Sequence, residues 1–85
     1  MDRMNLKTVK KILDYLIEFP FATANEIANF IKSSPATVMK YLNGLYKMGV
    51  VTFRKVGKIK RWKIDDKFLT SDGFKAFNKM LRVKR

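Results

Sequence analysis

The 85-residue sequence predicts a single domain of the α+β class, mostly α-helical, in which a two-stranded β-hairpin follows three helices and precedes a last helix. Two changes of pattern support this order. Apolar residues recur at helical spacing up to residue 48, and then alternate with polar residues from 50 to 65. Helical spacing returns after residue 70. Hydrophobic residues make up 47% of the chain, which is enough to build a core.

The first helix is expected at about residues 5–18. Charged residues occupy one side of it, and the apolar residues on the other side lie three or four positions apart: Leu6, Val9, Ile12, Leu13, Leu16 and Ile17. Phe19-Pro20 ends this helix, because the residue before a proline avoids the helical conformation. Phe21-Ala22 is then predicted to be a short extended segment.

The second helix is predicted at about residues 24–31. Thr23 and Glu26 have the spacing of a capping box, in which the N-cap hydroxyl and the carboxylate three positions later bind each other's backbone N–H. The polar residues 32–34 that follow the helix are expected to form a tight turn.

The third helix is predicted to begin at Pro35 and to run to about residue 48. Ser34 can cap this helix, and a proline at its first position removes only an N–H group that has no helical acceptor. Gly49 suits the left-handed conformation that follows many helices, so we expect the helix to stop there.

The hairpin is predicted from two alternating segments, residues 50–56 and 59–65, which flank Gly57-Lys58. Glycine at the first position of a two-residue turn is a strong hairpin signal. This turn predicts a register that sorts the side chains into one apolar face, Val51, Phe53, Trp62 and Ile64, and one polar face, Thr52, Arg54, Arg61 and Lys63. Arg54 opposite Arg61 brings like charges together, which a bound anion would relieve.

Asp65-Asp66-Lys67 is interpreted as a connector to the last helix, at about residues 70–84. Thr70 or Ser71 can cap that helix, and its apolar residues include Phe74, Phe77, Met80 and Leu81. These residues present more apolar surface than one short helix needs to cover a core, so this helix is a candidate for self-association.

The distribution of charge indicates the kind of partner. The net charge is +12, from 19 Lys and Arg against seven Asp and Glu. Residues 1–30 carry four acids and four bases, whereas residues 31–64 carry nine bases and no acid. A surface that serves only solubility normally mixes both signs. The basic block therefore predicts a polyanion as the partner.

Enzymatic chemistry has little support in the sequence. The chain has no Cys and no His, and hence no thiolate or imidazole for metal binding or general base catalysis. Asp65-Asp66 is not accompanied by a glycine-rich phosphate loop or a nucleophile motif. We expect neither catalysis nor a cofactor nor a metal. No apolar run approaches the roughly 18 residues that a membrane-spanning helix needs.

The stretch TANEIANFIKSSPATVMKYLNGLYKMGVV combines a short helix, a polar turn, a longer helix and the start of an apolar strand. Together with the hairpin, residues 5–65 resemble a winged helix-turn-helix domain, the DNA-binding unit of many small bacterial and archaeal transcriptional regulators. Small winged-helix proteins of archaea and their viruses are similar in size and lysine content. The resemblance implies a cytoplasmic, DNA-associated protein that binds double-stranded DNA, without an evident small-molecule ligand.

In the winged-helix family the third helix enters the major groove, and the hairpin, or wing, contacts the backbone or the minor groove. The residues that we expect at the DNA are Ser33, Ser34, Thr37, Lys40, Tyr41, Asn43, Lys47, Arg54, Lys55, Lys58, Lys60 and Arg61. A homodimer is expected, because a single helix per chain reads only one half-site.

Several alternatives stay open in the sequence. Sequence-specific regulation competes with low-specificity nucleic-acid binding, as in a nucleoprotein or a replication accessory protein, and with docking of a protein partner. Tyr41 can contact DNA or pack as a half-buried ring, and Gly44 can permit close approach of DNA or of another helix. Tyr46 is expected in the core or at an interface. Trp62 shares its face with apolar residues and is predicted to be core.

Overall fold

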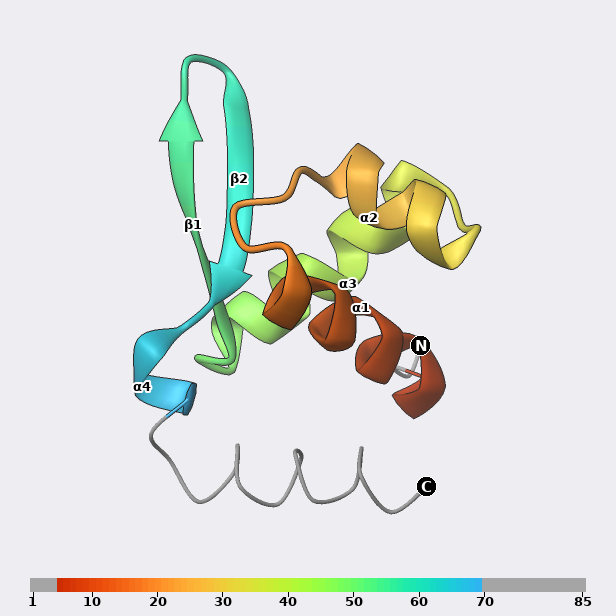
Figure 1. The fold of residues 1–85 in the computed structure, drawn as a ribbon, viewed down its shortest axis with the longest axis horizontal. Helices are drawn as coiled ribbons and strands as arrows, with labels where there is room; N and C mark the ends of the chain where they lie inside the picture. The colour runs from red at the N-terminus through yellow and green to blue at the C-terminus, as the bar shows by residue number, and fades with distance from the viewer. Residues whose placement is uncertain (1–4, 70–85) are drawn as a thin grey trace.

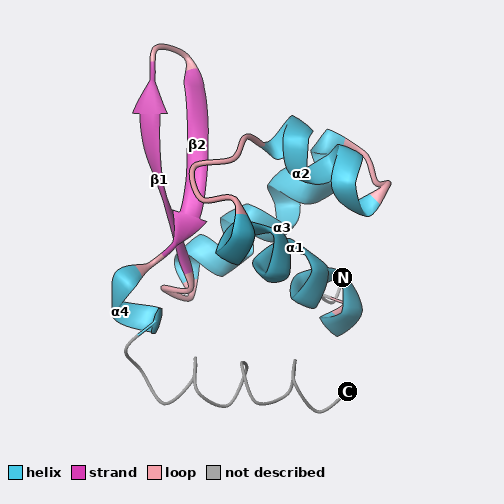
Figure 2. Ribbon diagram, in the orientation of Figure 1, coloured by secondary structure: helices cyan, strands magenta, loops and turns pink. Residues whose placement is uncertain are grey.

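The computed structural model describes residues 5–69, in which three helices surround one core and a hairpin projects from their side (Figures 1 and 2). The elements are α1 (Leu6–Glu18), α2 (Ala24–Ile31), α3 (Pro35–Lys47), β1 (Val51–Val56), β2 (Ile59–Ile64) and α4 (Asp66–Leu69). The order and bounds predicted for the first three helices and the hairpin are confirmed to within about one residue. The predicted last helix lies outside the described residues.

Polar side chains begin each of the three long helices, as the sequence predicts. Asn5 accepts a hydrogen bond from the backbone N–H of Lys7, 2.8 Å away. Thr23 and Glu26 form both bonds of the capping box, of 2.9 and 3.2 Å. Each side chain satisfies an N–H group that has no acceptor within the helix.

The end of α3 is a Schellman motif, in which Gly49 adopts the left-handed conformation at φ 79°. The N–H of Gly49 donates to the carbonyl of Tyr46 over 3.0 Å, and the N–H of Val50 donates to that of Leu45 over 2.9 Å. These bonds turn the chain directly from the helix into β1. Glycine is favoured here because a side chain at this φ is strained.

The hairpin has the predicted register, with Phe53 opposite Trp62 and Arg54 opposite Arg61. Gly57 lies at φ 64°, and Lys58 is not among the residues with positive φ. This is the pattern of a type II′ turn, whose twist matches that of the strands. The separation of the hairpin into an apolar and a basic face near its base is confirmed.

A third segment pairs with the outer edge of β2. Ala22 and Trp62 exchange two backbone hydrogen bonds, of 3.1 and 2.7 Å. Ala22 is thus extended, as predicted, but Phe21 is not, because its φ is 65°. The prediction for Phe21 was wrong: the sharp turn after Pro20 forces it into the left-handed region before the chain meets β2.

The core joins all three long helices to both strands. Trp62 is fully buried, which confirms its prediction as a core residue. The other buried residues are Ile12, Leu13, Leu16, Ala22, Ile27, Ala28, Val38, Leu42, Leu45, Val51 and Ile64. Because the hairpin contributes to this core through its base, its far end projects beyond the helices, as Figure 1 shows.

The segment after β2 differs from its prediction as a connector. Residues Asp66–Leu69 form the short helix α4, and the carboxylate of Asp65 accepts a hydrogen bond from the N–H of Lys67 over 2.8 Å. The Asp65-Asp66-Lys67 sequence therefore caps and begins a helical turn. The sequence does not distinguish this capping aspartate from a loop residue, because a charged pair at a strand end has the same composition in either setting.

Candidate nucleic-acid interface

The outer face of α3 is a continuous polar stripe. Thr37, Lys40, Asn43 and Lys47 are exposed, and they recur at intervals of three or four residues. The opposite side of the helix holds the buried residues Val38, Leu42 and Leu45. No acidic residue occurs in α3, so nothing on the stripe repels a polyanion.

The turn before α3 positions the first residue of this stripe. The hydroxyl of Ser34 accepts from the N–H of Thr37 over 3.1 Å and donates to the Thr37 hydroxyl oxygen over 2.9 Å. Ser34 therefore acts as the cap. The Thr37 hydroxyl accepts in this pair, so its own hydrogen can point outward to a ligand. Ser33, which precedes the cap, is half-buried, and its N–H donates to the carbonyl of Ala28.

Tyr41 lies beside the stripe but faces α1. Its hydroxyl accepts a hydrogen bond from the backbone N–H of Asn5, at 2.9 Å, and its ring is half-buried against the core. This contact connects the middle of α3 to the start of α1. The geometry favours the packing role for Tyr41 over a direct contact with DNA.

One face of the hairpin carries a lysine above two aromatic rings. The ammonium group of Lys60 lies 4.7 Å from the ring centroid of Phe53 and 5.8 Å from that of Trp62. Tyr46, 48% exposed, extends this cluster from α3, with its ring centroid 5.3 Å from that of Phe53. Tyr46 thus borders the core instead of lying within it. Lys55 is paired with Lys60, and both lie on the face of Trp62.

The opposite face of the hairpin gathers three cations around Phe21. The guanidinium of Arg54 lies 5.3 Å from the Phe21 ring, and the ammonium of Lys63 lies 5.4 Å from it. Arg61 donates to the carbonyl of Phe21 over 3.3 Å. Phe21 therefore supplies contacts that offset the repulsion between Arg54 and Arg61. From the sequence, a bound anion was expected to relieve this repulsion.

The structure thus divides the predicted hairpin contacts into two groups. Lys55, Lys58 and Lys60 lie on the Trp62 face or at the turn, whereas Arg54 and Arg61 contact Phe21 on the other face. The role of Phe21 is not predictable from the sequence, because the pairing of Ala22 with Trp62 joins segments 40 residues apart and leaves no local pattern.

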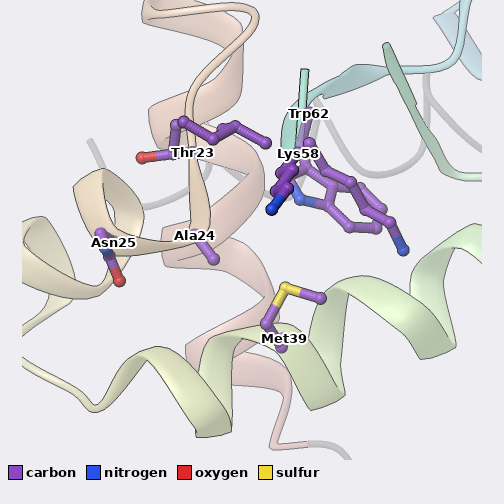
Figure 3. Close-up of a pocket in the computed structure, with 8 residues that line it drawn as sticks. Thr23, Ala24, Asn25, Met39, Lys58 and Trp62 are labelled. Atoms are coloured by element: carbon purple, nitrogen blue, oxygen red, sulfur yellow. The ribbon is translucent and has the colours of Figure 1, made fainter. Parts of the chain in front are cut away.

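A pocket of about 310 Å³ lies between the start of α2, the middle of α3 and the hairpin turn (Figure 3). Its lining residues are Thr23, Ala24, Asn25, Met39, Lys58, Ile59, Lys60 and Trp62. Lys58 and Lys60 are among the residues predicted at the DNA, whereas Thr23 and Asn25 are not. The capping box was the available signal, since it identifies a helix start, where free N–H groups favour anions.

In residues 5–69, no three acidic side chains come together in a group that could hold a metal ion, and the chain has no His or Cys. None of the helices in this part of the chain is long and apolar enough to cross a membrane.

Known structures share this fold. The homodimeric winged helix-turn-helix DNA-binding domain of a possible ArsR-family transcriptional regulator from Mycobacterium bovis is 22% identical, with a TM-score of 0.74 over 92% of this chain and 68% of that chain. ZitR, a zinc-responsive MarR family member from Lactococcus lactis, is 21% identical, with a TM-score of 0.67 over 94% of this chain and 58% of that one.

A MarR family transcriptional regulator from Silicibacter pomeroyi is 13% identical, with a TM-score of 0.71 over 92% of this chain and 53% of that chain. The present chain therefore spans a little over half the length of the two MarR family members. No curated protein sequence matches it.

The sequence itself identifies the family. The family model for winged helix-turn-helix DNA-binding domains matches residues 6–52, which extend from the start of α1 into β1 and include the polar stripe of α3. This match covers more than half of the chain. The protein belongs to the winged helix-turn-helix DNA-binding family.

Proposed function

We propose that the protein is a transcriptional regulator that binds double-stranded DNA sequence-specifically as a homodimer. Helix α3 lies in the major groove with Thr37, Lys40 and Asn43 at the base edges. The hairpin lies along the sugar-phosphate backbone, where Lys58 reaches the phosphates or the minor groove. The observation that carries this proposal is the exposed, acid-free stripe of α3 beside a basic hairpin.

The residue types on the stripe suit base recognition. Asparagine can pair with adenine through two hydrogen bonds, and lysine can donate to the O6 and N7 atoms of guanine. Thr37 offers a hydroxyl hydrogen at the start of the helix, where winged helices approach the bases. These side chains supply donors and an acceptor, whereas purely electrostatic binding would need only the lysines.

Selection of bound sites from a pool of random duplexes tests this function. We expect an enriched motif with two-fold symmetry, because a symmetric dimer presents two copies of α3. Recovery of duplexes without a common motif would contradict sequence-specific binding and would support the alternative of a low-specificity nucleoprotein.

The proposed dimer has a candidate surface on the described residues. An apolar hollow of about 280 Å³ lies at the end of α1, beside the base of β2 and α4. Ile17 is 44% exposed there and Leu69 is 37% exposed. The chain continues from Leu69 into the amphipathic residues 70–84, so we place the contact between protomers at this hollow. The homodimeric M. bovis domain supports this assembly.

A further inference from the structure

Within residues 5–69, the indole N–H of Trp62 is a buried side-chain donor that has no hydrogen-bond partner. The residue itself is fully buried. Tryptophan in a core normally finds an acceptor for this group, because an unpaired buried N–H costs free energy. Trp62 also lines the pocket between the hairpin turn and α2, and Figure 3 shows its ring nitrogen on the edge that faces Ala24.

The polar groups around this pocket are mainly hydrogen-bond donors and cations, and Ala24, Met39 and Ile59 add apolar surface. Lys58 and Lys60 line it from the hairpin, and the ammonium of Lys60 already lies 5.8 Å from the indole centroid. Ala24 and Asn25 line it from the first turn of α2, where backbone N–H groups have no helical acceptor. The carboxylate of Glu26 is turned to the backbone of Thr23 and does not line the pocket.

We propose that this pocket binds one phosphate of the DNA backbone, with the Trp62 indole N–H and the Lys58 and Lys60 ammonium groups donating to its oxygens. The inference rests on the proposed function and assigns it a specific contact. A phosphodiester accepts hydrogen bonds and donates none, which matches an indole that can only donate. The Trp62 nitrogen is buried, so the proposed contact requires the exposed Lys58 and Ile59 side chains that line the pocket to rotate away from it.

The position of the pocket agrees with the proposed docking. Its floor includes Met39, the residue before Lys40 on α3, and its rim is the hairpin turn. A duplex that holds α3 in its major groove and the hairpin on its backbone carries one strand across the gap between these elements. The pocket lies in that gap, so a phosphate there fixes the duplex relative to both elements.

Trp62 is the only tryptophan of the chain, so its indole N–H gives a single NMR resonance that reports on this contact directly. We would titrate the full ¹⁵N-labelled protein with a short duplex at low salt, and separately with inorganic phosphate at matched ionic strength. We expect the duplex to move the indole resonance downfield, as a new charge-assisted hydrogen bond requires, and phosphate alone to leave it in place.

Two lysine variants provide a matched comparison. Lys58→Gln and Lys55→Gln each remove one charge from the hairpin, but only Lys58 lines the pocket. Both are expected to make the slope of log affinity against log salt shallower by about one unit. Only Lys58→Gln should also reduce the indole shift. The dispersion of its amide spectrum shows whether Trp62→Phe is folded. The folded variant should bind the duplex about tenfold more weakly than the wild type.

The outcomes separate the two proposals. An indole resonance that stays in place while the amides of α3 shift would overturn the phosphate contact and leave the DNA-binding function standing. An equal shift with inorganic phosphate would overturn the assignment to the DNA backbone. Absence of any shift with duplex DNA would contradict the proposed function itself.

Discussion

Lysine supplies both cations of α3, at Lys40 and Lys47. Its ammonium is a flexible point charge without the planar fork of arginine, so it binds a phosphate as readily as a guanine edge. Discrimination between bases therefore depends also on the neighbouring amide of Asn43 and hydroxyl of Thr37. The stripe combines general attraction with a small number of groups that can recognise bases.

We predict that Lys40→Ala weakens the free energy of binding to the selected site by about 1–3 kcal/mol and weakens binding to random DNA by less. The affinity for the selected site relative to random DNA should therefore fall. The reason is that a base contact exists only on the preferred site. Binding curves on both DNAs at two salt concentrations measure this ratio. An equal loss on both DNAs would mean that Lys40 contacts phosphate, and base recognition would then lie elsewhere on α3.

Lys32 adopts the left-handed conformation at the end of α2, with φ 59°. A side chain in this region costs roughly 1–2 kcal/mol, a cost that glycine avoids. We predict that Lys32→Gly raises the free energy of unfolding by up to about 1 kcal/mol, measured by thermal or urea denaturation. Lys32→Ala is the control, because it removes the same charge but keeps the Cβ atom. Equal stabilisation by the two variants would mean that the gain comes from removal of the Lys32 charge and not from the backbone conformation.

At the scale of the elements, the hairpin is held from both faces. Trp62 anchors one face in the core, and the contacts of Arg54, Arg61 and Lys63 with Phe21 hold the other. Its far end, at Gly57 and Lys58, is exposed. The base of the hairpin is thus structural, and the turn is the part available to a partner.

The two ends of the hairpin should respond differently to mutation. We predict that Arg61→Ala lowers the free energy of unfolding by about 1 kcal/mol, because it removes a partly buried hydrogen bond to Phe21. Lys58→Ala should leave stability within about 0.5 kcal/mol of the wild type and weaken binding to all duplexes alike. Denaturation and binding curves for both variants are the measurements. Unchanged stability in Arg61→Ala, together with weaker binding, would identify Arg61 as a DNA contact.

At the scale of the whole molecule, residues 31–64 carry nine bases and no acid, so we expect this block to dominate the interaction with DNA. Each phosphate neutralised by a lysine or arginine releases counterions. We therefore predict that log affinity falls linearly and steeply with log salt concentration, with a slope set by several phosphate contacts. Fluorescence anisotropy with a labelled duplex measures this slope. A flat dependence would contradict binding through the basic block.

The proposed dimer predicts a specific effect of one apolar residue. Ile17→Lys places a charge in the hollow at the end of α1, and it should lower the mass measured by light scattering from dimer to monomer. Val56→Lys is the matched control, because Val56 is 53% exposed on the hairpin, away from that hollow. A wild-type protein that is monomeric at high concentration and on DNA would exclude the dimer.

The local features of the fold follow from short stretches of the sequence. The capping residues Thr23 and Ser34, the stop at Gly49 and the hairpin register could all be predicted, because each depends on residues a few positions apart. The basic block and the outward stripe of α3 were predictable for the same reason, since charge and helical spacing can be read along the chain.

Contacts between distant parts of the chain are visible only in the three-dimensional structure. The pairing of Ala22 with Trp62 places Phe21 among the hairpin cations, and the Tyr41 hydroxyl on α3 accepts from the backbone N–H of Asn5, 36 residues earlier. The same pairing holds the start of α2 beside β2, where the pocket lies next to the unpaired indole. Contacts between such distant segments depend on how the elements pack together, and no short sequence pattern encodes them.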